Sequence, residues 1–583
     1  MRYLFMPIVD PTSVVPAFKP VGIAYVAAAL RQTGRYVSGL HPAYHVNPTD
    51  ALLQKIEYDD IDVLCLGGLS ADFSVLTKII SEVRKHCPDI KIMVGGGVIS
   101  AEPEFIVQHL DIDFGCVGYG EETICEFAEC LETGGDFSKI KGLIYRDGAG
   151  QITINPQRSE PENLDNIPFP ALELFGFVHS EENLPILCAR SCMYNCTFCF
   201  HPSGYQYRER SLDNIFEEIA YWKEKYDIAS ITFHDEHIGN DQERFFELCD
   251  RLKKLGIIFN LYLRVDIVTD ELIKKLAESG CTNIIYGIES INQNVLDSMH
   301  KHITVEQIEY ALKITRKYNI DTNGSLIFGD RIETYEMAKQ SLEWWFKNIH
   351  YGLGLMLIEA YPGTALYEYG IREGRIKDKL EFLKNRCRGN LSAMSNAEYA
   401  KLKSQIMFLL NMTRRPAKKV GFDLGVNGEP IYCIACPCCG TVNHGDCKHI
   451  NSHEFAYLKE CAECGDSFMF EPAYRENHFA ARYFSEYDFS GKNVAVWGLS
   501  EAAQYRIASN RKMREAVCCI VDRDYRRFEG GFLGFAVQAP KVLATVEFDI
   551  LYVGSSTARE SILCMAREIV GHSLYKKEIM GVV

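Results

Sequence analysis

Four cysteines stand close together in the segment ILCARSCMYNCTFCFHP, and their thiols could hold a metal centre. They are Cys188, Cys192, Cys196 and Cys199, with three, three and two residues between neighbours. A [4Fe–4S] cluster that keeps one iron open for a further ligand needs three thiolates, whereas four thiolates close the cluster. The spacing alone also allows a zinc loop or a set of buried free thiols.

A second group of cysteines lies near the C-terminus, in two CxxCG turns. The turns are Cys436-Pro-Cys438-Cys439-Gly440 and Cys461-Ala-Glu-Cys464-Gly465. Two such turns complete a tetrahedral zinc site of the zinc-ribbon kind, so we predict structural zinc. The predicted ligands are Cys436, Cys439, Cys461 and Cys464. An auxiliary iron–sulfur cluster stays open, because four potential ligands are left over: Cys433, Cys438, Cys447 and His449.

Composition limits the compartment and the partners. The chain has 583 residues and 22 cysteines, and such thiols stay free or bind metal in a reducing compartment. Its start, MRYLFMPIVDPTS, lacks the apolar region of a signal peptide, and no apolar run approaches the roughly 20 residues of a membrane span. We therefore expect a cytoplasmic protein with no membrane partner. A net charge of −16 argues against a large nucleic-acid surface.

The elements that must position the first cysteine group lie in residues 185–370. Six apolar runs alternate there with helical patterns: LPILCAR, SITFHDE, FNLYLRV, NIIYGIES, TNGSLIFG and GLMLIEA. Six strand–helix units predict a partial (β/α)6 barrel of the TIM-like type, which places its chemistry at the carboxyl ends of the strands. The four cysteines follow the first of these strands.

With this context, the CxxxCxxC spacing of residues 192–199 resembles the radical S-adenosylmethionine (SAM) superfamily. The resemblance extends to Phe198 between the ligands, to FHDEHIG and LYLRVD at strand ends, to GIESINQNVLDSMHKHITVEQ, and to GSLIFGDRIET with Gly324 and Glu333. It implies that three cysteines hold a [4Fe–4S] cluster whose free iron binds SAM, and that one electron then yields a 5′-deoxyadenosyl radical. A fourth thiolate would occupy that iron, so Cys188 is expected to be a packed thiol.

The same resemblance implies which residues contact SAM. They are Phe198, Asp235, Glu236, Arg264, Glu289, Ser290 and Gly329.

Residues 1–150 alternate strands such as DVLCLGGLS and KIMVGGGVI with helices, which predicts a Rossmann-like α/β domain. No GxGxxG follows the first strand, so a dinucleotide is a poor fit. The pattern resembles the cobalamin-binding domains of cobalamin-dependent radical SAM enzymes, although the DxHxxG motif is absent and His41 and His45 do not fit its spacing. We expect cobalamin to bind without a histidine ligand; a degenerate domain that only packs on the barrel is the alternative.

The residues that this second resemblance assigns to cobalamin lie at predicted strand ends. They are Ser70, Gly95, Gly96, Gly97, Gly118, Tyr119, Gly120 and Glu121.

The remaining segments are assigned from their composition. Residues 151–184 are predicted to be a linker, 371–430 a helical connector and 431–475 the zinc-ribbon-like module. Residues 488–583 resemble the small Rossmann-like domains appended to sugar-modifying transferases, and are expected to present substrate or to pack.

These interpretations together predict a cobalamin-dependent radical SAM enzyme. The resemblance implies a C-methyltransferase that acts on an unactivated carbon of a small biosynthetic intermediate, reduced by a donor such as flavodoxin or ferredoxin. One SAM serves as oxidant and another remethylates cobalamin. The alternatives are a radical cyclase, rearrangement or oxidation enzyme without net methyl transfer, and an iron–sulfur sensor or binding protein.

Overall fold

The chain divides into two compact units, residues 1–406 and 407–583. The computed structural model describes residues 1–8, 20–45, 47–176, 183–201, 204, 206–226, 228, 230–239, 241–413, 418–424, 430–436, 439–446, 457–463, 467–470, 487–528, 530–554, 559–571, 574 and 577–581. No helix among these residues is long and apolar enough to cross a membrane.

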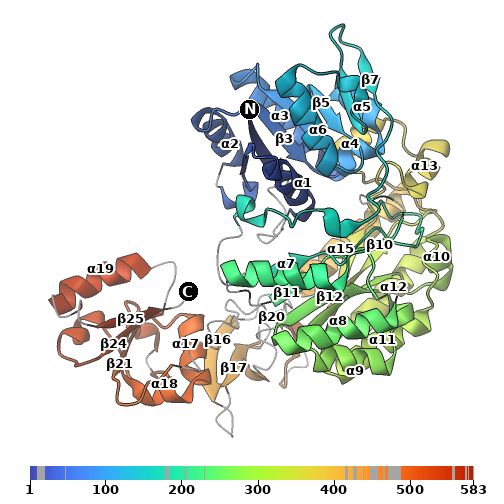
Figure 1. Cartoon of the computed structure of the whole chain (residues 1–583). Coiled ribbons are helices and arrows are strands. Elements are labelled where there is room, and N and C mark those ends of the chain that lie inside the picture. The colour runs from blue at the N-terminus through green and yellow to red at the C-terminus, as the bar shows by residue number, and fades with distance from the viewer. Residues whose placement is uncertain are drawn as a thin grey trace. The chain divides into compact units, whose positions relative to one another are not determined.

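The first unit begins with a seven-stranded sheet in the order β2-β1-β3-β4-β5-β6-β7, drawn in blue and cyan in Figure 1. Its strands are β1 Arg2–Pro7, β2 Tyr36–Gly39, β3 Val63–Gly67, β4 Lys91–Gly95, β5 Phe114–Cys116, β6 Leu143–Arg146 and β7 Ile152–Ile154. The first five are parallel, and the order reverses between β1 and β3. Ligands of doubly wound sheets bind at the carboxyl ends of the strands beside such a reversal.

Helices cover both faces of this sheet. They are α1 Val21–Gln32, α2 Pro48–Tyr58, α3 Phe73–His86, α4 Gly97–Ala101, α5 Pro103–His109 and α6 Glu121–Thr133. Helix α1 packs against α6, and α2 packs against α3. Helix α3 buries Phe73, Leu76, Ile80 and Val83, whose spacing of three or four residues places them on one face.

The second sheet of this unit has six parallel strands in the order β15-β14-β13-β12-β11-β8. They are β8 Asn183–Ile186, β11 Ser230–Phe233, β12 Ile258–Leu263, β13 Cys281–Glu289, β14 Asp321–Phe328 and β15 Gly354–Leu357. The intervening helices are α7 Leu212–Lys225, α8 Gln242–Leu255, α9 Asp270–Glu278, α10 Gln293–Ser298, α11 Val305–Lys317 and α12 Tyr335–Lys347. The predicted α/β class, with a Rossmann-like domain followed by a partial barrel, is confirmed.

One continuous apolar core joins the two sheets. It contains Leu76 and Val98 from the first sheet's helices and Ile358, which follows the barrel strand β15. It also contains Tyr367 of α13 (Ala365–Arg372) and Leu383 of α14 (Lys379–Lys384). A shared core of this kind holds the carboxyl edges of the two sheets in a fixed relation, because packed interiors do not deform continuously.

The second unit combines small antiparallel sheets with a parallel one. Strands β16 Lys418–Leu424, β17 Pro430–Ala435 and β18 Val442–Asp446 form one antiparallel sheet, and β19 Tyr457–Glu460 pairs with β20 Ser467–Phe470. The parallel sheet has the order β23-β22-β21-β24-β25. Its strands are β21 Val494–Trp497, β22 Val517–Val521, β23 Val537–Gln538, β24 Ile550–Val553 and β25 Glu578–Gly581, with helices α17 Glu501–Ser509, α18 Arg511–Ala516 and α19 Arg559–Val570.

Two features of the second half differ from the sequence expectation. The segment 371–430, expected to be helical, contains α14 and α15 (Asn396–Thr413) but continues into strand β16. In addition, Ile434 and Cys461 of the antiparallel region share one apolar core with Val494 and Ile550 of the parallel sheet. The two regions therefore pack as one body around this shared core.

Candidate active site

The first cysteine group lies in a loop at the carboxyl end of barrel strand β8. Two short antiparallel strands, β9 Ala189–Arg190 and β10 Arg208–Glu209, close the base of this loop. The backbone N–H of Thr197 donates to the carbonyl of Met299 at 2.9 Å, and its carbonyl accepts from the N–H of Leu366 at 2.8 Å. The loop, residues 191–207 and here called the cysteine loop, is thus tied to segments that follow β13 and β15.

The four thiols fall into two environments. Cys192 and Cys196 are half-buried and Cys199 is exposed, and each of the three influences another electrostatically. Although Cys199 is exposed as a residue, desolvation by the surrounding protein raises the pKa of its thiol to about 12, with further contributions from Cys196 and Glu236. Cys188 is buried, and burial raises the pKa of its thiol well above the usual value, with Asp235 the next cause. The structure therefore places Cys188 in the barrel wall.

Two positive side chains lie beside the cysteine loop. Burial raises the pKa of Cys196, and the charges of Lys301 and Arg264 oppose that rise. Lys301 donates from Nζ to Glu289 Oε1 at 2.7 Å, and its carbonyl accepts from Arg264 Nη2 at 2.7 Å. Arg264 also pairs with Asp266 at 2.9 Å and stacks 3.5 Å above the ring of Tyr194. Positive charge at this position favours thiolates, the form that binds iron.

Apart from Phe198, which lies in the cysteine loop, the residues assigned to SAM lie at the carboxyl ends of barrel strands, and their side chains differ in burial and in hydrogen-bond partners. Asp235 is buried, its Oδ1 accepts from the N–H of Ala189 at 2.5 Å, and burial raises its pKa to about 7. Its Oδ2 is buried without a hydrogen-bond partner among the described residues. Glu236 is exposed, and its carboxylate faces the Nδ1 of His201 at 3.1 Å.

The other assigned residues support the backbone of the site. Ser290 is buried, and its Oγ accepts from the N–H of Asn292 at 3.1 Å. Gly329 has φ +116°, and its N–H donates to Glu333 Oε2 at 2.6 Å. Burial raises the pKa of Glu333 to about 8.

Phe198 is half-buried against the apolar core. Glu289 has φ +63°, which directs its carboxylate onto Lys301.

This arrangement fits a [4Fe–4S] cluster with SAM. Three thiols on one short loop leave one iron without a protein ligand, and a buried carboxylate oxygen without a partner lies at the adjacent strand end. Iron–sulfur clusters carry negative charge with thiolate ligands, so the nearby lysine and arginine suit them.

The residues assigned to cobalamin lie along the carboxyl edge of the first sheet, at the ends of β3, β4 and β5. Gly96 has φ +85°, and a Cβ there would lie 2.8 Å from the carbonyl oxygen of Gly68. A Cβ on Gly95 would meet nothing closer than 3.9 Å, so bare backbone faces open space beside it. Gly118 has φ +76° and donates to Ser100 Oγ at 3.0 Å. Glycines at the carboxyl ends of neighbouring strands let a large flat ligand approach the backbone.

Two assigned cobalamin residues have partners in the barrel instead of standing open. Glu121 pairs with Arg190 of β9 at 2.6 Å, and the ring of Tyr119 lies 5.5 Å from the same guanidinium. Ser70 is buried at the start of a short helical turn after β3, and Gly120 lies against Val26 of α1.

Comparison with known proteins agrees with both halves of this geometry. The family model of the Radical SAM superfamily matches residues 186–344, and that of the B12 binding domain matches residues 12–128. The chain therefore contains a radical SAM domain and a B12 binding domain.

Several known proteins are similar to more than half of this chain. An uncharacterised methyltransferase of Pyrococcus horikoshii is 27% identical over 364 residues, which cover 60% of this chain and 78% of that protein. A bacteriochlorophyllide d C-8(2)-methyltransferase of Chlorobaculum tepidum is 26% identical, and the alignment covers 56% of this chain and 72% of that protein. The solved structure of the radical SAM methyltransferase TsrM from Kitasatospora setae, with cobalamin and a [4Fe–4S] cluster bound, aligns with a TM-score of 0.53 at 19% identity, covering 63% of this chain and 78% of that one. The structural likeness supports the fold.

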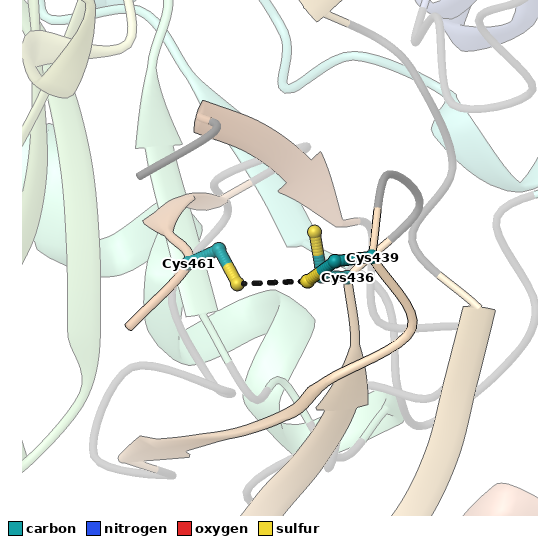
Figure 2. Close-up of side chains that lie close together, drawn as sticks. All are labelled: Cys436, Cys439 and Cys461. Atoms are coloured by element: carbon teal, nitrogen blue, oxygen red, sulfur yellow. Dashed lines mark hydrogen bonds between the residues drawn. The ribbon is translucent and has the colours of Figure 1, made fainter. Parts of the chain in front are cut away.

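Outside the radical SAM domain, three cysteines of the second group come together. The ligand atoms of Cys436, Cys439 and Cys461 all lie within 4.8 Å of one another, as Figure 2 shows. The Sγ atoms of Cys439 and Cys461 are 3.5 Å apart, and the buried Asn443 donates to Cys461 Sγ at 3.5 Å. The fourth predicted ligand, Cys464, lies outside the described residues, as do Cys438, Cys447 and His449. Thiols at these distances fit one tetrahedral ion.

Of the leftover residues, Cys433 is described. Its Sγ lies 3.6 Å from His444 Nδ1 on the neighbouring strand.

Sequence reasoning missed two buried cations next to the cysteine loop. Lys301 lies inside the run that carried the family resemblance but gave no signal of its own. Arg190 precedes Cys192 by two residues and has the appearance of an ordinary strand residue. Only their burial and their long-range partners identify them.

Proposed function

We propose that this chain is a cobalamin-dependent radical SAM C-methyltransferase that methylates an unactivated carbon of a small biosynthetic intermediate. The observation that carries the proposal is the contact between the two candidate cofactor regions. A Cβ on Gly97, in the cobalamin edge, would lie 2.8 Å from Cε1 of Phe200, the residue after Cys199. Methyl transfer to a carbon radical needs both cofactors to face one substrate.

When bound, the cluster and SAM would supply a 5′-deoxyadenosyl radical, and cobalamin would supply the methyl group. The chain's own residues have separate tasks. Cys192, Cys196 and Cys199 hold iron as thiolates, and Lys301 and Arg264 favour that charge state. Asp235 and Glu236 offer carboxylates to a cationic amino group at the end of β11. The ring of Phe200 lies between Gly97 of the first region and Gly363, which follows β15.

Three further assignments belong to this proposal. Zinc, held by Cys436, Cys439, Cys461 and Cys464, would be structural, since four thiolates leave no open position. A flavodoxin or ferredoxin would deliver the electron. A cytoplasmic location is supported by the 22 cysteines, which suit a reducing compartment.

The test uses anaerobically reconstituted enzyme with hydroxocobalamin, a strong reductant and SAM that carries a deuterated methyl group. A small-molecule extract serves as the source of substrate. We expect one 5′-deoxyadenosine and one S-adenosylhomocysteine for each labelled product. Products that form together with 5′-deoxyadenosine but carry no label would replace methyl transfer with cyclisation, rearrangement or oxidation. A complete lack of 5′-deoxyadenosine would contradict radical SAM chemistry.

A further inference from the structure

The cysteine loop is held at its beginning by an arginine that contacts the B12-binding domain. Arg190 ends strand β9, two residues before Cys192, and its side chain is 11% exposed. Its Nη2 donates to Glu121 Oε1 at 2.6 Å, and Glu121 opens helix α6, directly after the glycine-rich end of β5. The pair crosses from the barrel to the edge assigned to cobalamin.

Two aromatic rings from the B12-binding domain complete this contact. The guanidinium of Arg190 lies 5.1 Å from the ring centre of Tyr25, in α1, and 5.5 Å from that of Tyr119. Both tyrosines are buried. Although burial alone lowers the pKa of Arg190, Glu121 outweighs it, so the pKa lies above its usual value and the cation persists. Arg190 is therefore fixed in position by one carboxylate and two ring faces.

Within the cysteine loop, an aromatic side chain makes a second contact with the B12-binding domain. Phe200 follows Cys199, and its ring lies against Gly97, the first residue of α4. On its other side the ring contacts Gly363, where a Cβ would stand 3.6 Å from Phe200 Cε2. Any side chain at Gly97 would collide with this ring, so the close approach depends on glycine.

We propose that Arg190 and Phe200 are positioning residues that couple cobalamin binding to the cluster-binding state of the cysteine loop. Two of the predicted cobalamin segments make these contacts: residues 118–121 contact Arg190, directly before the loop, and Gly97 of residues 95–97 lies against Phe200 within it. Cobalamin that orders these segments also orders the cysteine loop. A loop that holds the cluster in turn orders the edge of the sheet that is assigned to cobalamin. Linkage requires the two effects to be equal in size. The inference rests on cobalamin binding as part of the proposed function.

The experiment measures hydroxocobalamin affinity by absorbance titration, without SAM or turnover, in protein with and without the reconstituted cluster. For the wild type we expect the cluster to tighten hydroxocobalamin binding about tenfold, within the usual range of coupling between sites. Iron release to a ferrous chelator should slow when hydroxocobalamin is saturating. In Arg190→Gln and in Phe200→Ala the ratio of the two affinities should fall to near one. Arg190→Lys, which keeps the charge, should recover part of it.

The control variant is Arg31→Gln. Like Tyr25, Arg31 lies on α1. It forms an ion pair of 2.6 Å with Glu173, and it contacts neither Arg190 nor Phe200. We expect the wild-type ratio in this variant. Circular dichroism of each variant shows whether it is folded before the affinities are compared.

Three results would overturn the inference: an affinity ratio of one in the wild type, an unchanged ratio in both Arg190→Gln and Phe200→Ala, or an equal loss in Arg31→Gln. Wild-type protein that binds no hydroxocobalamin would refute both this inference and the cobalamin dependence of the proposed function. Coupling without any methylated product would refute only the proposed function.

Discussion

Replacement of Lys301 by methionine tests whether a buried positive charge stabilises the thiolates of the cysteine loop. The side chains of Lys301 and Glu289 are 9% and 12% exposed, and their ion pair spans 2.7 Å. Removing one partner of a buried ion pair costs about 3–5 kcal/mol, because the other charge is left unpaired. In Lys301→Met the unpaired Glu289 would stand near Cys196, whose thiolate it disfavours. If about 3 kcal/mol of this free energy opposes iron binding, the affinity of the cysteine loop for iron falls about a hundredfold.

The assay is competition for iron between the anaerobically reconstituted protein and a ferrous chelator, with iron and sulfide counted per chain. Lys301→Met with Glu289→Gln removes both charges and should recover most of the affinity, although SAM binding stays weak. Lys275→Met is the matched control, because the Lys275–Asp250 pair lies on the barrel surface with Asp250 52% exposed. The reasoning fails if Lys301→Met binds iron as tightly as the wild type, or if the double variant is no better than the single one.

Three shorter predictions follow from buried groups. The Cys188→Ala variant should still bind iron, whereas alanine at Cys192, Cys196 or Cys199 should abolish iron binding. The ligand assignment is wrong if Cys188→Ala loses iron while one of the other three cysteines is dispensable. Burial raises the pKa of Glu333 from 4.5 to about 8, so the folded protein holds a proton that the unfolded chain releases, and stability falls as pH rises between these values. Glu333→Gln should lack this loss, and melting temperatures across that range would show it; parallel curves for both proteins would contradict it. The Cys461→Ser variant should lose its bound zinc in metal analysis, and residues 407–583 should unfold at a lower temperature. Iron instead of zinc in the wild-type protein would indicate an auxiliary cluster.

Local sequence pattern predicted much of the fold because strand and helix periodicities act over a few residues. Six apolar runs became the six barrel strands, and glycines marked the carboxyl ends of the first sheet. Several boundaries differed. Strand β7 of the first sheet lies in 151–184, which was expected to be a linker. LPILCAR was expected to be a single strand, but β8 ends at Ile186 and Ala189–Arg190 form a separate strand with β10. The carboxylate of the buried Asp235 accepts a hydrogen bond from the N–H of Ala189, the first residue of this separate strand. A tertiary hydrogen bond of this kind leaves no periodic signal.

The sequence by itself determined which residue types could bind iron, zinc and SAM, because ligand spacing within one loop is a local property. Only the tertiary structure decided how these groups are supported. Arg190 and Glu121 are separated by 69 residues, and Arg264 and the carbonyl of Lys301 by 37, yet each pair lies within hydrogen-bond distance. Such contacts depend on the order of strands in two sheets and on the core that joins them. The spacing of the cysteines predicts the iron ligands, and the packing of two domains fixes the loop that carries these cysteines.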